Sequence, residues 1–170
     1  KPGSWLALNT TNAADGLVEV SDTLGNPSGG HALNLQKLGL GTLALTGMNT
    51  YTGATKISQG VLSVNRLTNG GLPSALGQAT SHRSNLVFDG GVLRYTGPST
   101  RTDKGFTYAV ATNVYAFEVT QAGTVLTFGA VTNVVADSAN TTLLKTGPGT
   151  LVLAKGSGGG YNLALKAIHI

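Results

Sequence analysis

The stretch KLGLGTLALTGMNTYTG, from Lys37 to Gly53, combines closely spaced glycines with an alternating run of leucines. Leu43 and Leu45 fall on one side of an extended chain, because successive side chains of a β-strand point to opposite faces. The glycines before this run predict a tight turn that leads into the strand. They do not form a nucleotide loop, because G-x-G-x-x-G requires glycine where Ala44 stands and no helical pattern follows. The stretch therefore predicts a turn followed by a half-buried strand.

A second stretch, KTGPGTLVLA from Lys145 to Ala154, repeats the first ten residues of this motif with six identical positions. The lysine, both glycines, the threonine and both alternating leucines coincide at an offset of 108 residues. A stacked-repeat protein imposes the same turn and the same core contacts on each of its units. We therefore expect the two copies to occupy the same place in a stack.

Short alternating runs separated by turn residues fill the rest of the chain. NLVFD, VLRYT and VLTFG each alternate apolar residues over one face, and LTNGG, FDGG and TGPST supply turn chemistry between such runs. Only LPSALGQA, residues 72–79, leaves room for one short helical turn. The pattern indicates an almost all-β chain, which suits the 25 glycines and the low charged fraction of 11%.

Uneven strand and spacer lengths favour a parallel β-helix, with three short strands per coil, over antiparallel hairpins. Asn-Gly at 69–70 and Asp-Gly at 89–90 suit tight hairpins, so the sequence pattern favours a solenoid only modestly over a β-sandwich. Coils of roughly 20 to 25 residues predict about seven coils and a rod roughly 35 Å long, at the ~4.8 Å spacing of paired strands.

The stretch from Leu35 to Val64 closely resembles the autotransporter-associated β-strand repeat, also called the passenger-associated transport repeat. The family core has the form K-x-G-x-G-T-L-x-L-x-G-x-N-T-Y-T-G-x-T-x-I-x-x-G-x-L, and the sequence follows it from Lys37 to Leu62. SALG, GGVL and DKGFT, further along the chain, look like later elements of the same unit. The resemblance implies an all-β, right-handed, single-stranded parallel β-helix that is a fragment of a longer rod.

The resemblance also implies a division of the chain. Residues 1–34 would be degenerate upstream coils, residues 35–144 one full repeat unit, and residues 145–170 the start of a second, decayed unit. The motif residues are expected to build turns and core: Lys37, Gly39, Gly41, Thr42, Leu43, Leu45, Gly47, Asn49, Tyr51, Gly53, Lys145, Gly147, Gly149, Leu151 and Leu153.

Asn49 to Gly53 are the part of the motif left open as a contact surface, because the second copy lacks them. Asn49 is expected to cap a turn or to form one rung of an asparagine ladder. Tyr51 is expected to pack over a coil edge with its hydroxyl in solvent.

By resemblance, the chain is a structural segment of an autotransporter passenger from a Gram-negative bacterium, located at the cell surface or secreted. Its expected partners are neighbouring coils of the same protein and, through unpaired strand edges, further copies of itself. An outer-membrane barrel is expected in a part of the full-length protein that this sequence does not include. The resemblance implies no enzyme activity and no cofactor.

The net charge of +4 is spread thinly along the chain. A nucleic-acid-binding protein would concentrate cations on one face beside aromatic residues, so no nucleic-acid partner is predicted. The densest group of cations is a candidate anion-binding surface for host glycans or matrix, formed by Arg83, Arg94, Arg101 and Lys104.

A polysaccharide enzyme of the pectate-lyase type is the remaining alternative. Such β-helix enzymes use carboxylates on neighbouring coils, and the seven acidic residues here include no D-x-D pair. Two of them could still meet across coils. His31, His82 and His169 lack the G-x-S-x-G elbow of a serine hydrolase. No catalytic residue, metal ligand or cofactor-binding residue is therefore predicted.

Overall fold

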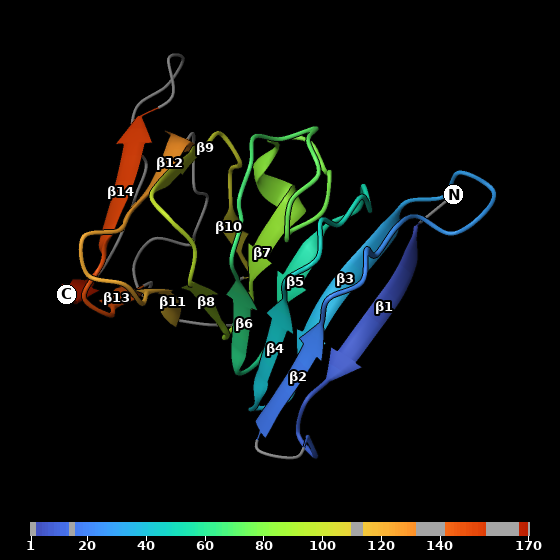
Figure 1. Ribbon diagram of the computed structural model, residues 1–170, viewed down its shortest axis with the longest axis horizontal. Coiled ribbons are helices and arrows are strands. Elements are labelled where there is room, and N and C mark those ends of the chain that lie inside the picture. The colour runs from blue at the N-terminus through green and yellow to red at the C-terminus, as the bar shows by residue number, and fades with distance from the viewer. Residues whose placement is uncertain (1–2, 14–15, 110–113, 132–141, 156–166, 170) are drawn as a thin grey trace.

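The computed structural model describes residues 3–13, 16–109, 114–131, 142–155 and 167–169, which form parallel strands in three sheets (Figure 1). Every strand pair among these residues is parallel, so consecutive coils stack along the rod. The parallel β-helix predicted from the sequence is therefore confirmed, and the β-sandwich is wrong.

Sheets A and B form two sides of the rod, and in the described residues sheet C forms a third side only from the fourth coil onward, so the first three coils lack the third strand that the sequence predicted. Sheet A contains, in order, β1 (Ser4–Asn9), β3 (Leu33–Leu38), β5 (Thr55–Ile57), β7 (Leu86–Phe88) and β10 (Thr107–Tyr108). Sheet B contains β2 (Leu17–Val20), β4 (Thr42–Leu45), β6 (Val61–Val64), β8 (Val92–Tyr95), β11 (Val114–Val119), β13 (Thr142–Thr146) and β15 (Ala167–His169). Sheet C contains β9 (Thr100–Thr102), β12 (Val125–Val131) and β14 (Thr150–Lys155).

In the described part of the chain sheet B has seven strands, one from each of seven coils, which agrees with the predicted number. The coil lengths vary more than expected. Leu62 pairs with Leu43 in the preceding coil and with Leu93 in the following coil, so the two intervals are 19 and 31 residues. The longer interval contains the loop of residues 65–82, which lies outside the strands and enlarges the third coil.

The described residues contain very little helix. A 3₁₀ turn, Arg83–Asn85, leads into β7, and the segment predicted as a short turn closes through a bond from the Gly77 N–H to the Ser74 carbonyl at 3.0 Å. Within these residues no helix is long and apolar enough to cross a membrane.

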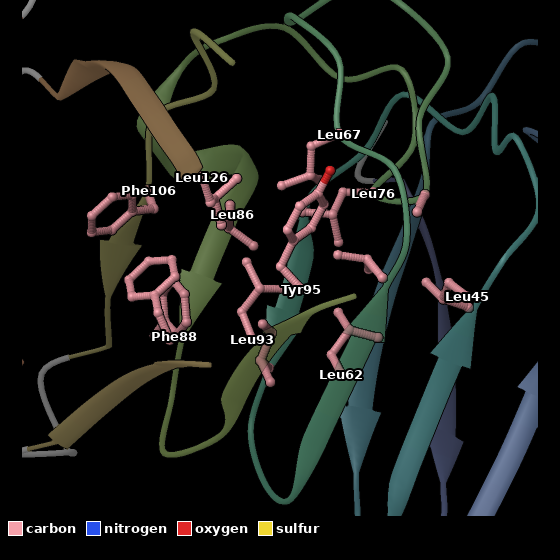
Figure 2. Packing of buried hydrophobic residues seen from close by; sticks show 14 of the residues in the cluster. Leu45, Leu62, Leu67, Leu76, Leu86, Phe88, Leu93, Tyr95, Phe106 and Leu126 are labelled. Atoms are coloured by element: carbon pink, nitrogen blue, oxygen red, sulfur yellow. The ribbon is translucent and has the colours of Figure 1, made fainter. Parts of the chain in front are cut away.

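The core is a set of rows in which one inward residue of each coil lies above the next. Leu43, Leu62, Leu93 and Phe117 form such a row in sheet B, and each is fully buried. Figure 2 shows Leu62, Leu93 and Tyr95 pointing into the same interior as Leu86 and Phe88 of sheet A. The predicted alternation of apolar residues thus positions one buried face per strand.

The four phenylalanines of the chain gather where the fourth and fifth coils meet. Phe106 and Phe117 lie 5.2 Å apart between ring centroids, and each lies 5.4 Å from Phe128. Phe88 completes the group, 4.8 Å from Phe117. Edge-to-face pairs of this kind stabilise a core beyond the area that they bury, so this cluster anchors the C-terminal half of the described rod.

Candidate functional site

Lys37, the first residue of the motif, points into the rod rather than into solvent. It lies in an inward row of sheet A between Leu8 and Ile57, and its side chain is fully buried. The Lys37 Nζ donates to the carbonyls of Leu38 at 2.8 Å, Gly39 at 2.6 Å and Gln59 at 3.1 Å. Burial lowers the pKa of Lys37, while three carbonyl acceptors match the three donors of an ammonium group. Lys37 therefore closes its own corner and fastens it to the next coil.

Gly39 allows this corner to form and to stack. Its φ of +78° is a left-handed conformation that disfavours other residues. A Cβ atom here would also collide with the Asn9 side chain and, at 2.5 Å, with the Thr11 backbone nitrogen, both in the preceding coil. Glycine is thus required twice, by the backbone angle and by the close approach of two coils.

Lys145 reproduces the corner locally. Its Nζ donates to the carbonyls of Thr146 at 2.9 Å and Gly147 at 2.8 Å, and Gly147 has a φ of +77°. The expectation that both copies occupy the same place in the stack is wrong, however. Lys37 lies near the end of β3 in sheet A, before the corner to sheet B, whereas Lys145 lies near the end of β13 in sheet B, before the corner to sheet C. The motif therefore builds a corner that occurs at more than one edge of the rod, and we call it a transferable corner.

The strand after this second corner is less enclosed than the first. Leu151 and Leu153 are partly buried and pack against the core, whereas Leu43 and Leu45 are fully buried. Gly149 has no room for a side chain, because a Cβ atom would meet Val119 and, at 2.7 Å, the Gln121 carbonyl. The glycines and leucines of the motif therefore keep their building roles in the second copy.

Lys104 closes the third kind of corner, between sheets C and A. Only 5% of its surface is exposed, and its Nζ lies 3.2 Å from the Ala79 carbonyl and 3.5 Å from the Gly77 carbonyl, both in the preceding coil. Burial lowers the pKa of Lys104, and the neighbouring Asp103 carboxylate partly opposes this effect. Lys104 therefore serves the fold and is not available to an anion on the surface.

The structure also separates the other three cations of the predicted anion-binding surface. Arg83 lies in the 3₁₀ turn before sheet A, Arg94 in β8 of sheet B, and Arg101 in β9 of sheet C. Arg94 forms an ion pair with Glu118 at 2.7 Å, and Arg101 approaches the Gly129 carbonyl at 3.5 Å. The four cations do not come together on one face.

Asn49 joins three coils. Its Oδ1 accepts a bond from the Leu24 N–H of the preceding coil at 2.8 Å, and its Nδ2 donates to the Ala75 carbonyl of the following coil at 2.9 Å. Backbone bonds between Asn49 and Ser74 add an isolated bridge at the same level. This fully buried amide caps neighbouring turns, as one of the two predicted roles requires.

Tyr51 is fully buried, so the expectation of a solvated hydroxyl is wrong. The hydroxyl lies 2.6 Å from the Thr55 Oγ1, and the ring fills the space that a side chain at Gly77 would need. Burial raises the pKa of Tyr51, and the Thr55 hydrogen bond opposes this effect. Asn49 and Gly53 are also buried, so most of the segment from Asn49 to Gly53 faces the interior, and Thr52 is its exposed residue.

The acidic side chains that the structure describes include no constellation suited to a metal. No group of three or more potential His, Cys, Asp or Glu ligands occurs among them. Asp89 pairs with Lys56 at 2.8 Å on sheet A, and Glu118 pairs with Arg94 on sheet B. Asp15 lies outside the described residues, and the side chain of His169 is likewise not described.

The outer face of sheet A carries a polar network that the repeat motif does not indicate. The Gln36 Nε2 donates to the Ser58 Oγ at 3.0 Å, and the Ser58 Oγ donates to the Asp89 Oδ2 at 3.3 Å. Trp5 lies on the same face at the first coil and is 55% exposed. Trp5 alternates with Leu6 and Leu8, which pack against the core, and this alternation in the sequence is what indicates its outward direction.

Comparison with known proteins assigns the central segment to a family. Residues 35–64 match the family described as passenger-associated-transport-repeat. Over 150 residues the chain is 35% identical to the adhesin BmaC autotransporter of Brucella suis biovar 1 (strain 1330). The match covers 88% of this chain but 4% of that protein, so the chain spans a small part of the relative's length. No solved structure matches the chain.

Proposed function

We propose that this chain, which carries a passenger-associated transport repeat at residues 35–64, is a β-helical segment of an autotransporter passenger. The segment is displayed at the surface of a Gram-negative bacterium, or secreted from it, and supports the export of its own passenger. The observation that carries this proposal is the position of Asn49, whose side chain binds one coil on each side of its own. The autotransporter name of the relative supports the same assignment.

Export support follows from the way in which one coil templates the next. A folded coil presents unpaired backbone groups and inward side chains to the chain that arrives after it. Once Asn49 and Lys37 have bonded to neighbouring coils, their strands are too bulky to return through the pore by which they left. Folding outside the membrane therefore biases movement outward.

Surface display of the full-length autotransporter tests this proposal. Asn49→Leu removes both cross-coil bonds at nearly constant volume, and the expected result is a lower yield of passenger accessible to protease on intact cells. Leu40→Ser is the matched control, because Leu40 lies in the same motif but is 80% exposed. Unchanged display of Asn49→Leu, with the purified segment clearly destabilised, would refute the export role and leave the β-helix assignment intact.

An adhesive role is the second candidate, and the word adhesin in the relative's name favours it. The dispersed positions of Arg83, Arg94 and Arg101 do not support an anion-binding version of this role. An adhesive surface would instead use one face of a single sheet.

The repeat family and the relative's name both indicate a structural or adhesive role rather than an enzymatic one. The pectate-lyase alternative gains no support from Asp89 and Glu118. Each of these carboxylates is neutralised by a cation, and the two lie on different sheets.

A further inference from the structure

The outer face of sheet A is distinguished by what surrounds its exposed tryptophan. A single exposed apolar residue is ordinary on a protein surface. Trp5, however, pairs across strands with Asn34, and Gln36 follows two residues later on the same outward side of β3. Residues at such direct and diagonal positions lie within reach of a long or aromatic side chain. The indole therefore borders the Asn34 amide, which already bonds to the Ser4 carbonyl and the Ala54 N–H, and lies diagonal to Gln36.

A connected chain of polar side chains continues from Gln36 across the next two coils. Gln36 pairs with Lys56 in register, and Lys56 forms an ion pair at 2.8 Å with the same Asp89 oxygen that accepts from Ser58. The side chains of Lys56 and Asp89 remain 30% and 20% exposed. The network is thus held in place by its own bonds while still open to solvent.

We propose that this face, formed by Trp5, Asn34, Gln36, Lys56, Ser58 and Asp89, binds a neutral glycan that lies across the strands. One apolar face of a sugar ring would stack on the exposed indole, whose ring is apolar and whose N–H is polar. The hydroxyls of the next sugars would bond to Gln36, Ser58 and the Lys56–Asp89 pair, which offer both donors and acceptors.

Charge selects a neutral glycan over an anionic polymer. Lys56 is the cation of this face, and its charge is compensated by Asp89. An anion would compete with Asp89 for the ammonium, whereas a hydroxyl can bond to both partners without separating them. This inference rests on the adhesive role proposed above, and it replaces a cationic surface by a neutral one.

Intrinsic fluorescence offers a direct test, because Trp5 is the only tryptophan of the chain. The purified chain would be titrated with laminarin, yeast mannan and dextran as neutral probes, and with heparin as the anionic probe. We expect a saturable change in Trp5 emission with at least one neutral polysaccharide. Gln36→Ala, at a half-buried position of the network, should weaken that binding about tenfold.

Variants outside the face provide the controls. Leu17→Ala changes a residue of the same coil that is 51% exposed on sheet B, and this variant should bind as the unchanged chain does. Trp5→Ala, followed by calorimetry, should abolish binding while circular dichroism stays the same. The proposal fails if no neutral polysaccharide binds, if heparin alone binds, or if Trp5→Ala and Gln36→Ala leave the affinity unchanged. None of these failures would affect the proposal of a β-helical passenger segment, whose test is surface display.

Discussion

The Lys37 ammonium donates to the carbonyl of Gln59, which lies in the next coil, at 3.1 Å. The same nitrogen also holds two carbonyls of its own corner, so one buried cation satisfies acceptors from two coils. An unpaired buried carbonyl costs free energy. The bond between Lys37 and Gln59 therefore makes the stability of one coil depend on the presence of the next.

Replacing Lys37 by methionine should destabilise the chain by about 2–3 kcal/mol, because the stem is kept while buried acceptors lose their donor. The free energy of unfolding in urea, followed by circular dichroism, measures this effect. Lys145→Met is the matched control, since its bonds to described residues lie within its own corner and are exposed. We expect a change below about 1 kcal/mol there. Equal losses at both sites would show that the bond to Gln59 adds nothing.

Gly39→Ala should cost about 3 kcal/mol or more, because backbone strain adds to a steric collision with the preceding coil. Gly123→Ala isolates the strain. Gly123 has a similar φ of +80°, but no atom lies within 4 Å of the Cβ position. Its expected cost is about 1 kcal/mol. Denaturation of both variants under the same conditions gives the comparison, and a smaller loss at Gly39 than at Gly123 would contradict the stacking argument.

Tyr51 should make the fold sensitive to alkali. Burial raises the pKa of Tyr51 above its ordinary value of 10.0, so the folded state retains a proton that the unfolded chain releases. Its contribution to stability is complete below pH 10 and declines as the pH rises above that value. Burial lowers the pKa values of Lys37 and Lys104, so below pH 10.5 the unfolded chain binds protons more readily than the folded state does at these two groups. Their effect is therefore to make the fold less stable as the pH falls below 10.5.

The contribution of Tyr51 can be separated by comparing Tyr51→Phe with the unchanged chain. The variant loses the hydrogen bond to Thr55 at every pH, but its stability should fall less between pH 10 and pH 12. Thermal unfolding at stepped pH measures both curves. Parallel curves would mean that the pKa of Tyr51 is the same in the folded and the unfolded chain, contrary to its burial.

Heparin binding should respond to the arginines independently. Arg83, Arg94 and Arg101 lie on three sides of the rod, so each change to serine should remove a small and similar part of any salt-dependent affinity. Affinity chromatography with a salt gradient measures the losses. A single substitution that abolished retention would indicate a focused site, contrary to this arrangement.

End-to-end association is expected of the 170-residue chain in isolation. Strands β1 and β2 form one edge of sheets A and B, and unpaired edges favour pairing with another chain. Light scattering over a concentration series should show growth in mass. Leu17→Lys places a charge on the edge strand β2 and should reduce that growth. Leu40→Lys, in an exposed corner, should not, and a monomer at high concentration would refute the expectation.

Period-two alternation predicted much of this architecture. Leu43 and Leu45 had to face one side, and the observed burial agrees. Coil length was harder to predict, because the loop of residues 65–82 adds to one coil without any change in hydrophobic pattern. The offset between the two copies of the motif does not correspond to a whole number of coils, because the first copy precedes a corner from sheet A to sheet B and the second a corner from sheet B to sheet C.

The interior contacts of the motif depended on residues distant in sequence. Strand alternation places Lys37 on the inward side with Leu35. Lysine is rarely buried, so the carbonyls around Lys37 are needed to explain why this position is tolerated. Tyr51 appears exposed until the segment that contains Gly77 covers its ring. Trp5, in contrast, was predictable as an outward residue from its own strand.

The transferable corner has a consequence for the way such rods diversify. A lysine–glycine cassette that works between sheets A and B, and again between sheets B and C, can be duplicated without preserving whole turns. Each such duplication would rotate every downstream loop by about one side of the triangular cross-section. Recombination between copies would thus move a displayed epitope to another side of the rod while the core contacts stay the same.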